Sequence, residues 1–299
     1  MKLLTFHTER GLQVGIKTER GILDIAKAAG TYHTDDPSLQ SIEQIVEGGV
    51  EVLESLTRLL TLAGDADDDE LWLAEDSLRL GPCVPQPGKI ICVGLNYRKH
   101  AEESKLPIPE SPVLFNKFAN SIAAHEETIQ LPKGTSQVDY EAELAIVIGK
   151  KAKHVSKENA LEYVFGYCNA NDLSARDLQN RTSQWLLGKS CDGFCPVGPY
   201  LVTSDEVGNP NDLRIRSYVG GEVRQDSNTG DMIFACDEIV SYISSYMTLE
   251  PGDIILTGTP EGVILGYPKE KQIWLADGDE ATIEIEKLGR LTNRFQDEA

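Results

Sequence analysis

The segment Val138–Gly149 constrains the fold of this chain more than any other. It reads Val-Asp-Tyr-Glu-Ala-Glu-Leu-Ala-Ile-Val-Ile-Gly, so acids at alternate positions lead into an apolar run of strong β character. On a strand, residues two apart point to the same face, with neighbours roughly 7 Å apart. Asp139, Glu141 and Glu143 therefore share one face of a predicted strand.

Three acids on one strand face repel each other unless a cation or protons intervene. Hard cations such as Mg²⁺ and Mn²⁺ prefer carboxylate oxygens, so these acids are candidate metal ligands. The alternative is the solvated face of an edge strand, because charge alternation on strands is common. The segment alone leaves both interpretations open.

Two further segments carry residues suited to the same chemistry. Asp172 follows the apolar run Tyr163–Ala170, and an acid at a strand end either reaches a shared pocket or caps a helix. If Asn96–Glu103 is helical, His100 and Glu103 are neighbours at a spacing of three. A carboxylate beside an imidazole raises its basicity, so the pair could act as a general base. The alternative is an exposed charged helix with an incidental histidine.

The order of predicted elements favours two parts. Residues 1–80 are predicted to form a small α/β domain, with short strands and a helix in the range 38–62. Pro82, Pro85, Pro87 and Gly88 mark a boundary, and residues 81–299 are predicted to form a larger strand-rich domain. The predicted strands there are 90–95, 113–116, 142–148, 164–170, 200–203, 213–219, 253–257 and 281–285. The predicted helices are 96–104, 157–162, 174–185 and 236–245.

The charge of the chain excludes several classes of partner. Its formal net charge is −20, which repels nucleic-acid phosphates and anionic membrane surfaces. No apolar run reaches the roughly 18 residues of a membrane span. The first residues show no signal-peptide core and the six cysteines show no Cys-x-x-Cys pair, so we expect a cytoplasmic protein in a reducing compartment.

Together these segments resemble the fumarylacetoacetate hydrolase family over roughly residues 89–266. The match rests on the order and spacing of several motifs. They are Val93-Gly-Leu-Asn-Tyr97 with His100 and Glu103; Pro112-Val-Leu-Phe-Asn-Lys117; Asp139-Tyr-Glu-Ala-Glu143; Gly166-Tyr, Asn171-Asp172-Leu-Ser-Ala-Arg176-Asp177 and Gln179; Gly188-Lys189-Ser190; Pro196-Val-Gly-Pro199; and Thr257-Gly-Thr-Pro-Glu-Gly-Val263.

The resemblance implies a β-rich α+β fold, with a mixed β-sheet rolled into a barrel-like sandwich, and a homodimer. It also implies one Mg²⁺ or Mn²⁺ held by Glu141, Glu143 and Asp172. It places the His100–Glu103 pair on a mobile lid and gives Lys189 a role in neutralising a developing enolate or carboxylate. The residues it implies for holding the substrate are Lys117, Arg176, Gln179 and Thr259.

The expected substrate is a small 2-oxo acid, which a metal can polarise as a Lewis acid. The leading hypothesis is hydrolysis of a C–C bond in an acylpyruvate-like acid, with His100 deprotonating the attacking water. The alternatives are oxaloacetate decarboxylation or tautomerisation, hydration or dehydration of a sugar-derived 2-oxo acid, and a non-catalytic metal-binding protein. Arg176 could instead form a structural ion pair, and Trp185 is expected in the core or an interface.

Overall fold

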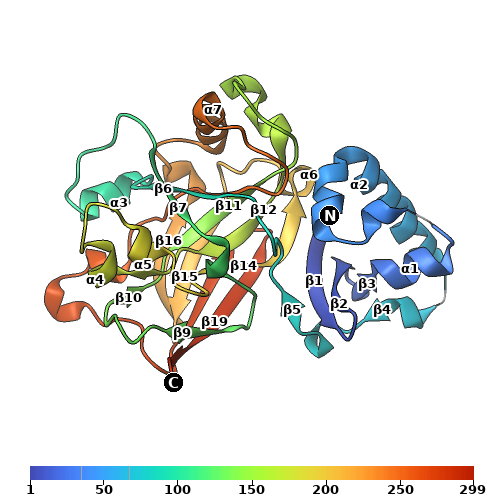
Figure 1. The fold of residues 1–299 in the computed structure, drawn as a ribbon, viewed down its shortest axis with the longest axis horizontal. Coiled ribbons are helices and arrows are strands. Elements are labelled where there is room, and N and C mark those ends of the chain that lie inside the picture. Colours follow the sequence, from blue (N-terminus) through green and yellow to red (C-terminus); the bar gives the residue numbers. More distant parts are fainter. Residues whose placement is uncertain (35, 67) are drawn as a thin grey trace.

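The fold was obtained as a computed structural model that describes residues 1–34, 36–66 and 68–299 (Figure 1). Within those residues, the strands form a 12-stranded sheet, a five-stranded sheet and a two-stranded sheet. The strands are β1 (Lys2–Thr8), β2 (Gly11–Lys17), β3 (Ile22–Asp24), β4 (Trp72–Leu73), β5 (Leu80–Gly81), β6 (Ile90–Gly94), β7 (Val113–Lys117), β8 (Ile122–Ala123), β9 (Thr128–Leu131), β10 (Val138–Asp139), β11 (Ala142–Ile148), β12 (Val164–Asn171), β13 (Ser174–Ala175), β14 (Cys195–Thr203), β15 (Arg214–Val219), β16 (Glu222–Asn228), β17 (Ile254–Leu256), β18 (Glu280–Ile285) and β19 (Gly289–Asp297).

Helices are fewer and mostly short. The α-helices of the described residues are α1 (Ile25–Thr31), α2 (Ile42–Asp65), α3 (Arg98–Glu103), α4 (Arg176–Gln179), α5 (Leu186–Lys189), α6 (Ser204–Val207) and α7 (Cys236–Tyr246). The 3₁₀ turns are η1 (Pro37–Leu39), η2 (Asp69–Leu71), η3 (Glu75–Ser77), η4 (Ala119–Ser121), η5 (Lys157–Tyr163), η6 (Thr229–Asp231), η7 (Ile264–Gly266) and η8 (Lys269–Lys271). The predicted helix over 174–185 is therefore wrong, because β13 and α4 occupy its first half and α5 begins after it.

The larger sheet is built around the antiparallel strands β11 and β12. Its order is β4-β3-β2-β1-β14-β12-β11-β17-β6-β7, with β5 beside β1 and β8 beside β14. Both faces of β11 are buried: Leu144 and Ile146 face one hydrophobic core, while Ala145 and Val147 face another. Alternation along a strand explains why a continuous apolar run is needed here.

The five-stranded sheet covers one face of the larger sheet. Its order is β16-β15-β18-β19-β9, and Ile215 of β15 and Ile283 of β18 share a core with Leu144 of β11. The expected β-rich α+β fold is thus confirmed. The sheets stack as a sandwich and are not closed into a barrel, since the larger sheet ends at β4 and β7 among the described strands.

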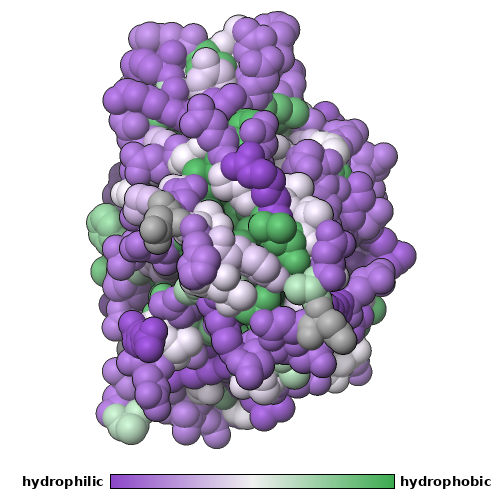
Figure 2. Space-filling model, turned by 90° about the vertical axis from the view of Figure 1, so that its right-hand side faces the viewer, coloured by the Kyte–Doolittle hydropathy of each residue, from purple (hydrophilic) through white to green (hydrophobic). Residues whose placement is uncertain are grey.

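The N-terminal elements extend the larger sheet at one end. β1 joins β14 through the pairs Lys2↔Val202 and Leu3↔Leu201, and α2 packs its apolar face into the core beneath. Figure 1 shows these elements, in blue, beside the rest of the chain. Figure 2 views this side, which is mostly hydrophilic with small apolar areas between the polar side chains. The division at residue 80 stays a prediction.

The connection from β6 to β7 carries α3. These strands are antiparallel neighbours, paired from Ile90↔Lys117 to Gly94↔Val113. Residues 95–112 therefore leave the sheet and return to it at adjacent positions. Asn96 anchors the start of this connection: its side-chain amide donates to the carbonyls of Phe234 and Thr257.

Asn169 should be essential to the joining of the two sheets. This fully buried residue of β12 accepts from the Ile285 amide of β18 at 2.9 Å and donates to the carbonyls of Gly198 at 3.0 Å and Leu288 at 3.1 Å. Asn169→Ala leaves these groups buried without partners, so we expect it to lower the free energy of unfolding by about 2–4 kcal/mol. Urea unfolding measures the change, with the exposed Asn159→Ala as a control expected to stay within about 0.5 kcal/mol. Equal stability of the two variants would contradict this role.

Candidate active site

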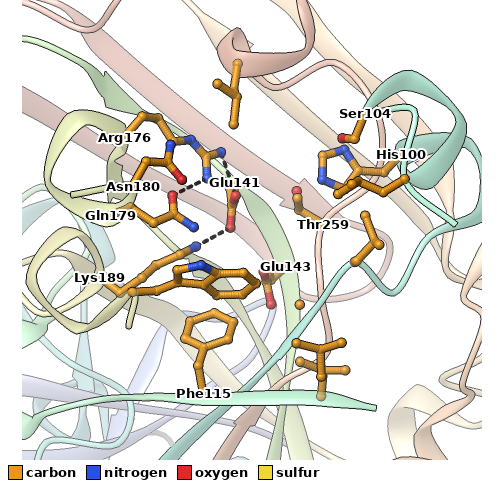
Figure 3. A pocket seen from close by; sticks show the side chains of 17 residues that line it. His100, Ser104, Phe115, Glu141, Glu143, Arg176, Gln179, Asn180, Lys189 and Thr259 are labelled. Atoms are coloured by element: carbon orange, nitrogen blue, oxygen red, sulfur yellow. Dashed lines mark hydrogen bonds and ion pairs between the residues drawn. The ribbon is translucent and has the colours of Figure 1, made fainter. Parts of the chain in front are cut away.

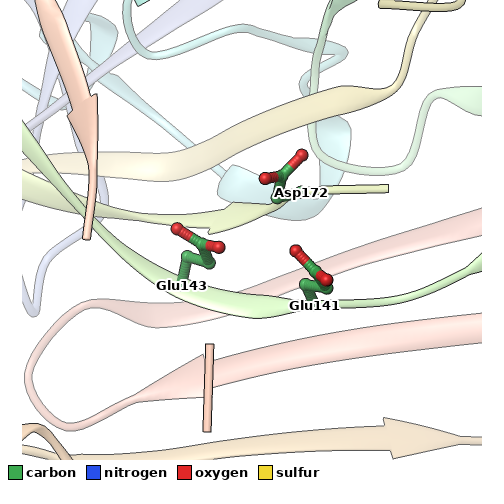
Figure 4. A group of neighbouring side chains, drawn as sticks. All are labelled: Glu141, Glu143 and Asp172. Atoms are coloured by element: carbon green, nitrogen blue, oxygen red, sulfur yellow. The ribbon is translucent and has the colours of Figure 1, made fainter. Parts of the chain in front are cut away.

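Three buried carboxylates gather where β10, β11 and β12 meet (Figure 4). Glu143 lies on β11, Glu141 just before it, and Asp172 just after β12. The antiparallel register places Ala142 opposite Asn171, and the Asp172 amide donates to the Glu141 carbonyl at 3.0 Å. One oxygen from each of the three side chains lies within 4.8 Å of the others. A buried set of oxygen donors at this separation fits a hard divalent cation.

Three cationic side chains surround these acids. The Lys189 ammonium lies 2.7 Å from Glu141 and 2.9 Å from Asp172, and Arg176 Nη2 lies 2.6 Å from Glu141. Lys117, on β7, donates to Asp172 from the other side at 2.5 Å. Close packing of two short helices brings Lys189 and Arg176 together, since a Cβ at Gly188 would lie 2.5 Å from the Ala175 carbonyl.

The buried charges do not balance. The four acids are Asp139, Glu141, Glu143 and Asp172, and the three bases are Lys117, Arg176 and Lys189. Four negative charges against three positive leave one negative charge, and a divalent cation would change this to one positive charge. The acids Glu141, Glu143 and Asp172 form a carboxylate triad. The imbalance falls on Glu143, the member of this triad without an ion pair among the described residues.

The pKa values of the two glutamates move in opposite directions. Burial alone would raise the pKa of Glu141, but Lys189 and Arg176 outweigh it and lower that pKa to about 2. For Glu143, burial and then the charges of Asp172 and Glu141 raise the pKa well above its ordinary value. Its one backbone partner, the Gly258 amide at 2.7 Å, does not compensate for this. Glu143 is therefore the carboxylate that gains most from a bound cation.

His100 and Glu103 lie together on α3, with the Nδ1 of His100 3.3 Å from Glu103 Oε2. Glu103 also accepts from the Gly262 amide at 3.2 Å. If Nδ1 donates its proton to Glu103, the Nε2 of His100 is left as a free acceptor. A carboxylate that orients an imidazole in this way prepares it to act as a base.

A single pocket of about 340 Å³ collects most of these groups (Figure 3). Glu141, Glu143 and Lys189 form its floor, and His100 faces them from the opposite side. The other predicted residues that line it are Arg176, Gln179 and Thr259. Lys117, Glu103 and Asp172 are not among the residues that line it. Lys117 is only 2% exposed and its ammonium contacts Asp172 and the Leu173 carbonyl, so the structure does not bring it to the substrate side.

Residues 89–296 match the model of the family described as "Fumarylacetoacetate (FAA) hydrolase C-terminal". That range covers more than half of the chain. The chain belongs to the fumarylacetoacetate hydrolase family.

Relatives and solved structures agree with this assignment. An oxaloacetate tautomerase of Rattus norvegicus is 41% identical over 302 residues, which cover 98% of this chain and 91% of the relative. One of Homo sapiens is 46% identical over 213 residues, or 71% and 67% of the two chains. A fumarylacetoacetate hydrolase from Exiguobacterium antarcticum has 36% identity and a TM-score of 0.83, with both chains fully covered. A maleylpyruvate hydrolase from Sphingobium, solved with manganese(II) and pyruvate, has 29% identity and a TM-score of 0.79, again with full coverage.

These names also correct one expectation. Both tautomerases are named mitochondrial, which contradicts the cytoplasmic location expected from the sequence. The expectation rested on a search for a signal-peptide core, which relates to secretion and does not distinguish the cytoplasm from the mitochondrion. None of the helices in the described residues is long and apolar enough to cross a membrane.

The pocket is also lined by residues that were not predicted from the sequence. Phe115 and Trp185 pack edge to face with ring centroids 5.3 Å apart and line the pocket, so Trp185 is not confined to a core or an interface. Ser104, Asn180 and Leu265 also line the pocket. The sequence carries one signal for this wall, the glycine that ends an otherwise apolar strand. In the structure, a Cβ at Gly94 would lie 2.8 Å from the Trp185 ring.

Glu143→Gln should raise the stability of the metal-free protein and weaken metal binding. Because the pKa of Glu143 is raised above its ordinary value of 4.5, the folded chain binds this proton more tightly than the unfolded chain. The metal-free protein should therefore lose stability as pH rises above about 4.5. The variant lacks this titration, and its amide oxygen still accepts from Gly258. We expect it to be more stable than the parent at pH 7 without metal, by about 1–3 kcal/mol.

The same variant should lose affinity for Mn²⁺ by at least about 100-fold, because even loss of an outer partner of a metal ligand costs 10–100-fold. Urea unfolding across a pH series in chelator, and calorimetric titration with Mn²⁺, measure the two effects. Glu162→Gln, at an exposed position, is the control. Parallel pH profiles for parent and variant, or unchanged Mn²⁺ affinity, would show that Glu143 does not hold this role.

Proposed function

We propose that this chain is a divalent-metal-dependent enzyme of small 2-oxo acids, and that it interconverts the keto and enol forms of oxaloacetate. The main support is that two carboxylates of the triad, the Lys189 ammonium and the His100 imidazole face one pocket. A second support is the relative named oxaloacetate tautomerase, 41% identical over 98% of this chain. We retain Mg²⁺ or Mn²⁺ as the cofactor and a homodimer as the assembly.

The charges of the site suit a carboxylate substrate. Glu141, Glu143 and Asp172 would hold the cation, which when bound supplies Lewis acidity toward the 2-oxo and carboxylate oxygens. The net charge of the buried groups would then be one positive, as counted above, and a substrate carboxylate would neutralise it. Arg176 contributes indirectly, since Asp139, Glu141 and Gln179 already occupy its guanidinium.

Lys189 stabilises the negative charge that develops at the 2-oxo oxygen. Burial would lower the pKa of Lys189, but Asp172 and Glu141 raise it above its ordinary value, so the ammonium stays protonated. Two of its three protons are directed at these carboxylates, which fixes the direction of the third. The Phe115 ring, 4.9 Å from Nζ, keeps water from this side.

His100 moves the proton. Its Nε2 removes a proton from C3 of oxaloacetate and returns it to the 2-oxo oxygen, while Glu103 holds Nδ1 and stabilises the imidazolium in between. α3 lies in the connection between β6 and β7, so movement of this connection would admit substrate and release product.

A second candidate is hydrolysis of an acylpyruvate-like C–C bond. The favouring observation is the similar structure of a maleylpyruvate hydrolase that holds manganese(II) and pyruvate. In that reaction His100 would take a proton from water and the water oxygen would attack the distal carbonyl. C–C cleavage would leave a carboxylic acid and the enolate of pyruvate, and His100 would return its proton to the enolate carbon to give pyruvate. Decarboxylation of oxaloacetate would need no attacking water and would release CO₂.

Turnover by chelator-stripped protein tests these reactions. We expect Mg²⁺ or Mn²⁺ to restore interconversion of enol- and keto-oxaloacetate, which is measured as a loss of enol absorbance. We also expect little release of CO₂ and slow cleavage of acetylpyruvate. Glu141→Gln should abolish the metal-restored rate, because it removes a ligand and a partner of Lys189. Faster cleavage of acetylpyruvate would favour the hydrolase, and faster release of CO₂ the decarboxylase. No turnover in any assay, with Mn²⁺ shown to bind, would refute the proposal for these substrates.

His100→Asn isolates the proton-transfer step. We expect kcat to fall by roughly 10²–10⁴, the range for loss of a general base, with Mn²⁺ affinity unchanged. His154→Asn is a matched control, because His154 is exposed, lies outside the pocket lining and has a positive φ that Asn tolerates. Full activity of His100→Asn would remove His100 from the mechanism.

A further inference from the structure

Asp139 is a fully buried carboxylate that does not belong to the metal-binding triad. Its Oδ1 accepts from the Ile264 amide at 2.8 Å, and its Oδ2 accepts from the Leu265 amide at 3.0 Å. Arg176 donates to the same Oδ2 from Nε at 2.9 Å, and its Nη2 forms an ion pair with this oxygen at 2.8 Å. One side chain thus joins segments that are far apart in the sequence.

The backbone turn 262–266 that Asp139 holds is also the place where Glu103 rests. The Gly262 amide donates to Glu103, and a Cβ at Gly266 would lie 2.2 Å from the Glu103 carboxyl carbon. The Glu103 carboxylate therefore packs directly on the backbone of this turn. Tyr140, next to Asp139, donates its hydroxyl to the Gly262 carbonyl at 2.9 Å and holds the same turn.

Arg176 carries the second connection, toward the polar wall of the pocket. Its Nη1 donates to the Gln179 side-chain oxygen at 2.9 Å, and its Nη2 donates to Glu141 at 2.6 Å. A guanidinium has only donors, so it selects the oxygen of the Gln179 amide and leaves the NH₂ group free for other partners. Gln179 lines the pocket, so the orientation of this hydrogen-bond donor depends on Arg176 and, through it, on Asp139.

We propose that Asp139 is a positioning residue. It holds the turn that receives Glu103 at a fixed position relative to the Arg176 guanidinium, which orients Gln179. It thereby sets the position of His100 relative to the polar wall of the pocket, without contacting the substrate. This role rests on the proposed function for its effect on turnover. Its structural part, the docking of α3 on turn 262–266, does not depend on any substrate.

Asp139→Asn tests the role, because it replaces one acceptor oxygen by an NH₂ group that faces existing N–H donors. We expect kcat to fall at least tenfold and KM to rise severalfold, with Mn²⁺ affinity within threefold of the parent. Hydrogen exchange of the backbone amides of α3, measured without substrate, should accelerate at least tenfold. The matched control is Asp253→Asn: Asp253 is equally buried, accepts from the Glu250 amide and pairs with Lys89, but lies outside the pocket lining. It should change neither kcat nor the exchange of α3.

A double-mutant cycle with Glu103→Gln distinguishes positioning from general destabilisation. If Asp139 acts through the docked Glu103, Asp139→Asn should lower kcat less than threefold in the Glu103→Gln background. A fall as large as in the parent background would overturn the proposal. Unchanged exchange of α3 in folded Asp139→Asn would also overturn it. Faster exchange of α3 in a protein that turns over no 2-oxo acid would support the docking and reject the proposed function.

Gly266→Ala probes the docking if Asp139→Asn fails to fold. Gly266 ends the η7 turn without a positive φ, and the atoms nearest to its added methyl would be those at the end of the flexible Glu103 side chain. We expect a folded protein with faster exchange of α3, at least tenfold lower kcat and a KM within twofold of the parent, since Arg176 and Gln179 keep their contacts. Parent-like exchange and kcat in Gly266→Ala would overturn the proposal.

Discussion

The rest of the site depends on the neutralisation of carboxylates that the fold buries where β10, β11 and β12 meet. An isolated buried carboxylate is costly, and four of them close together are tolerated only with cations or protons nearby. Lys117, Arg176 and Lys189 supply three positive charges from three separate parts of the chain. The fourth carboxylate has no such partner among the described residues, and a divalent cation would turn the net charge of the buried groups from one negative to one positive.

This arrangement needs a rigid support, which the two cores provide. β11 is apolar on both faces because the N-terminal elements cover one side and the five-stranded sheet covers the other. Only at its N-terminal end does the strand leave these cores, and there the acids begin. The segment 139–148 thus combines buried acids with a buried apolar run a few residues later.

Much of this was readable from the sequence. The apolar runs identified β11 and β12, and period-two spacing pointed to Glu141 and Glu143 as neighbours, because both signals are local. The same spacing also predicted Asp139 on this strand, but the strand is interrupted between β10 and β11, and Asp139 lies on β10 in another sheet. The predicted helix over 174–185 failed because Arg176 and Gln179 occupy a short turn that is held by contacts with distant residues. β16 and β19 were not predicted. β16 (Glu222–Asn228) is a mostly polar edge strand, and β19 pairs on one side with β9, which is far along the chain.

The roles of single residues were harder to predict than the strands. Lys117 and Arg176 were both expected at the substrate, yet Lys117 lies behind Asp172, and the donors of Arg176 contact protein groups. A sequence indicates that a cationic side chain lies near the acids, but the side from which this side chain approaches depends on packing in three dimensions. Trp185 was expected in a core or an interface. A large apolar side chain suits a pocket wall equally well, and only packing in three dimensions distinguishes these places.

The placement of α3 between β6 and β7 has a consequence for how such proteins diverge. Residues 95–112 enter and leave the larger sheet on adjacent antiparallel strands, so the distance between their ends is fixed by the pairing Gly94↔Val113. A connection of this kind tolerates changes in length and sequence, as surface loops generally do, without shifting the strands that bear the acids. The segment covering the pocket can therefore change during evolution while the charged floor is retained. Because this segment carries His100 and Glu103, such a change would alter the proton-transfer groups independently of the buried acids.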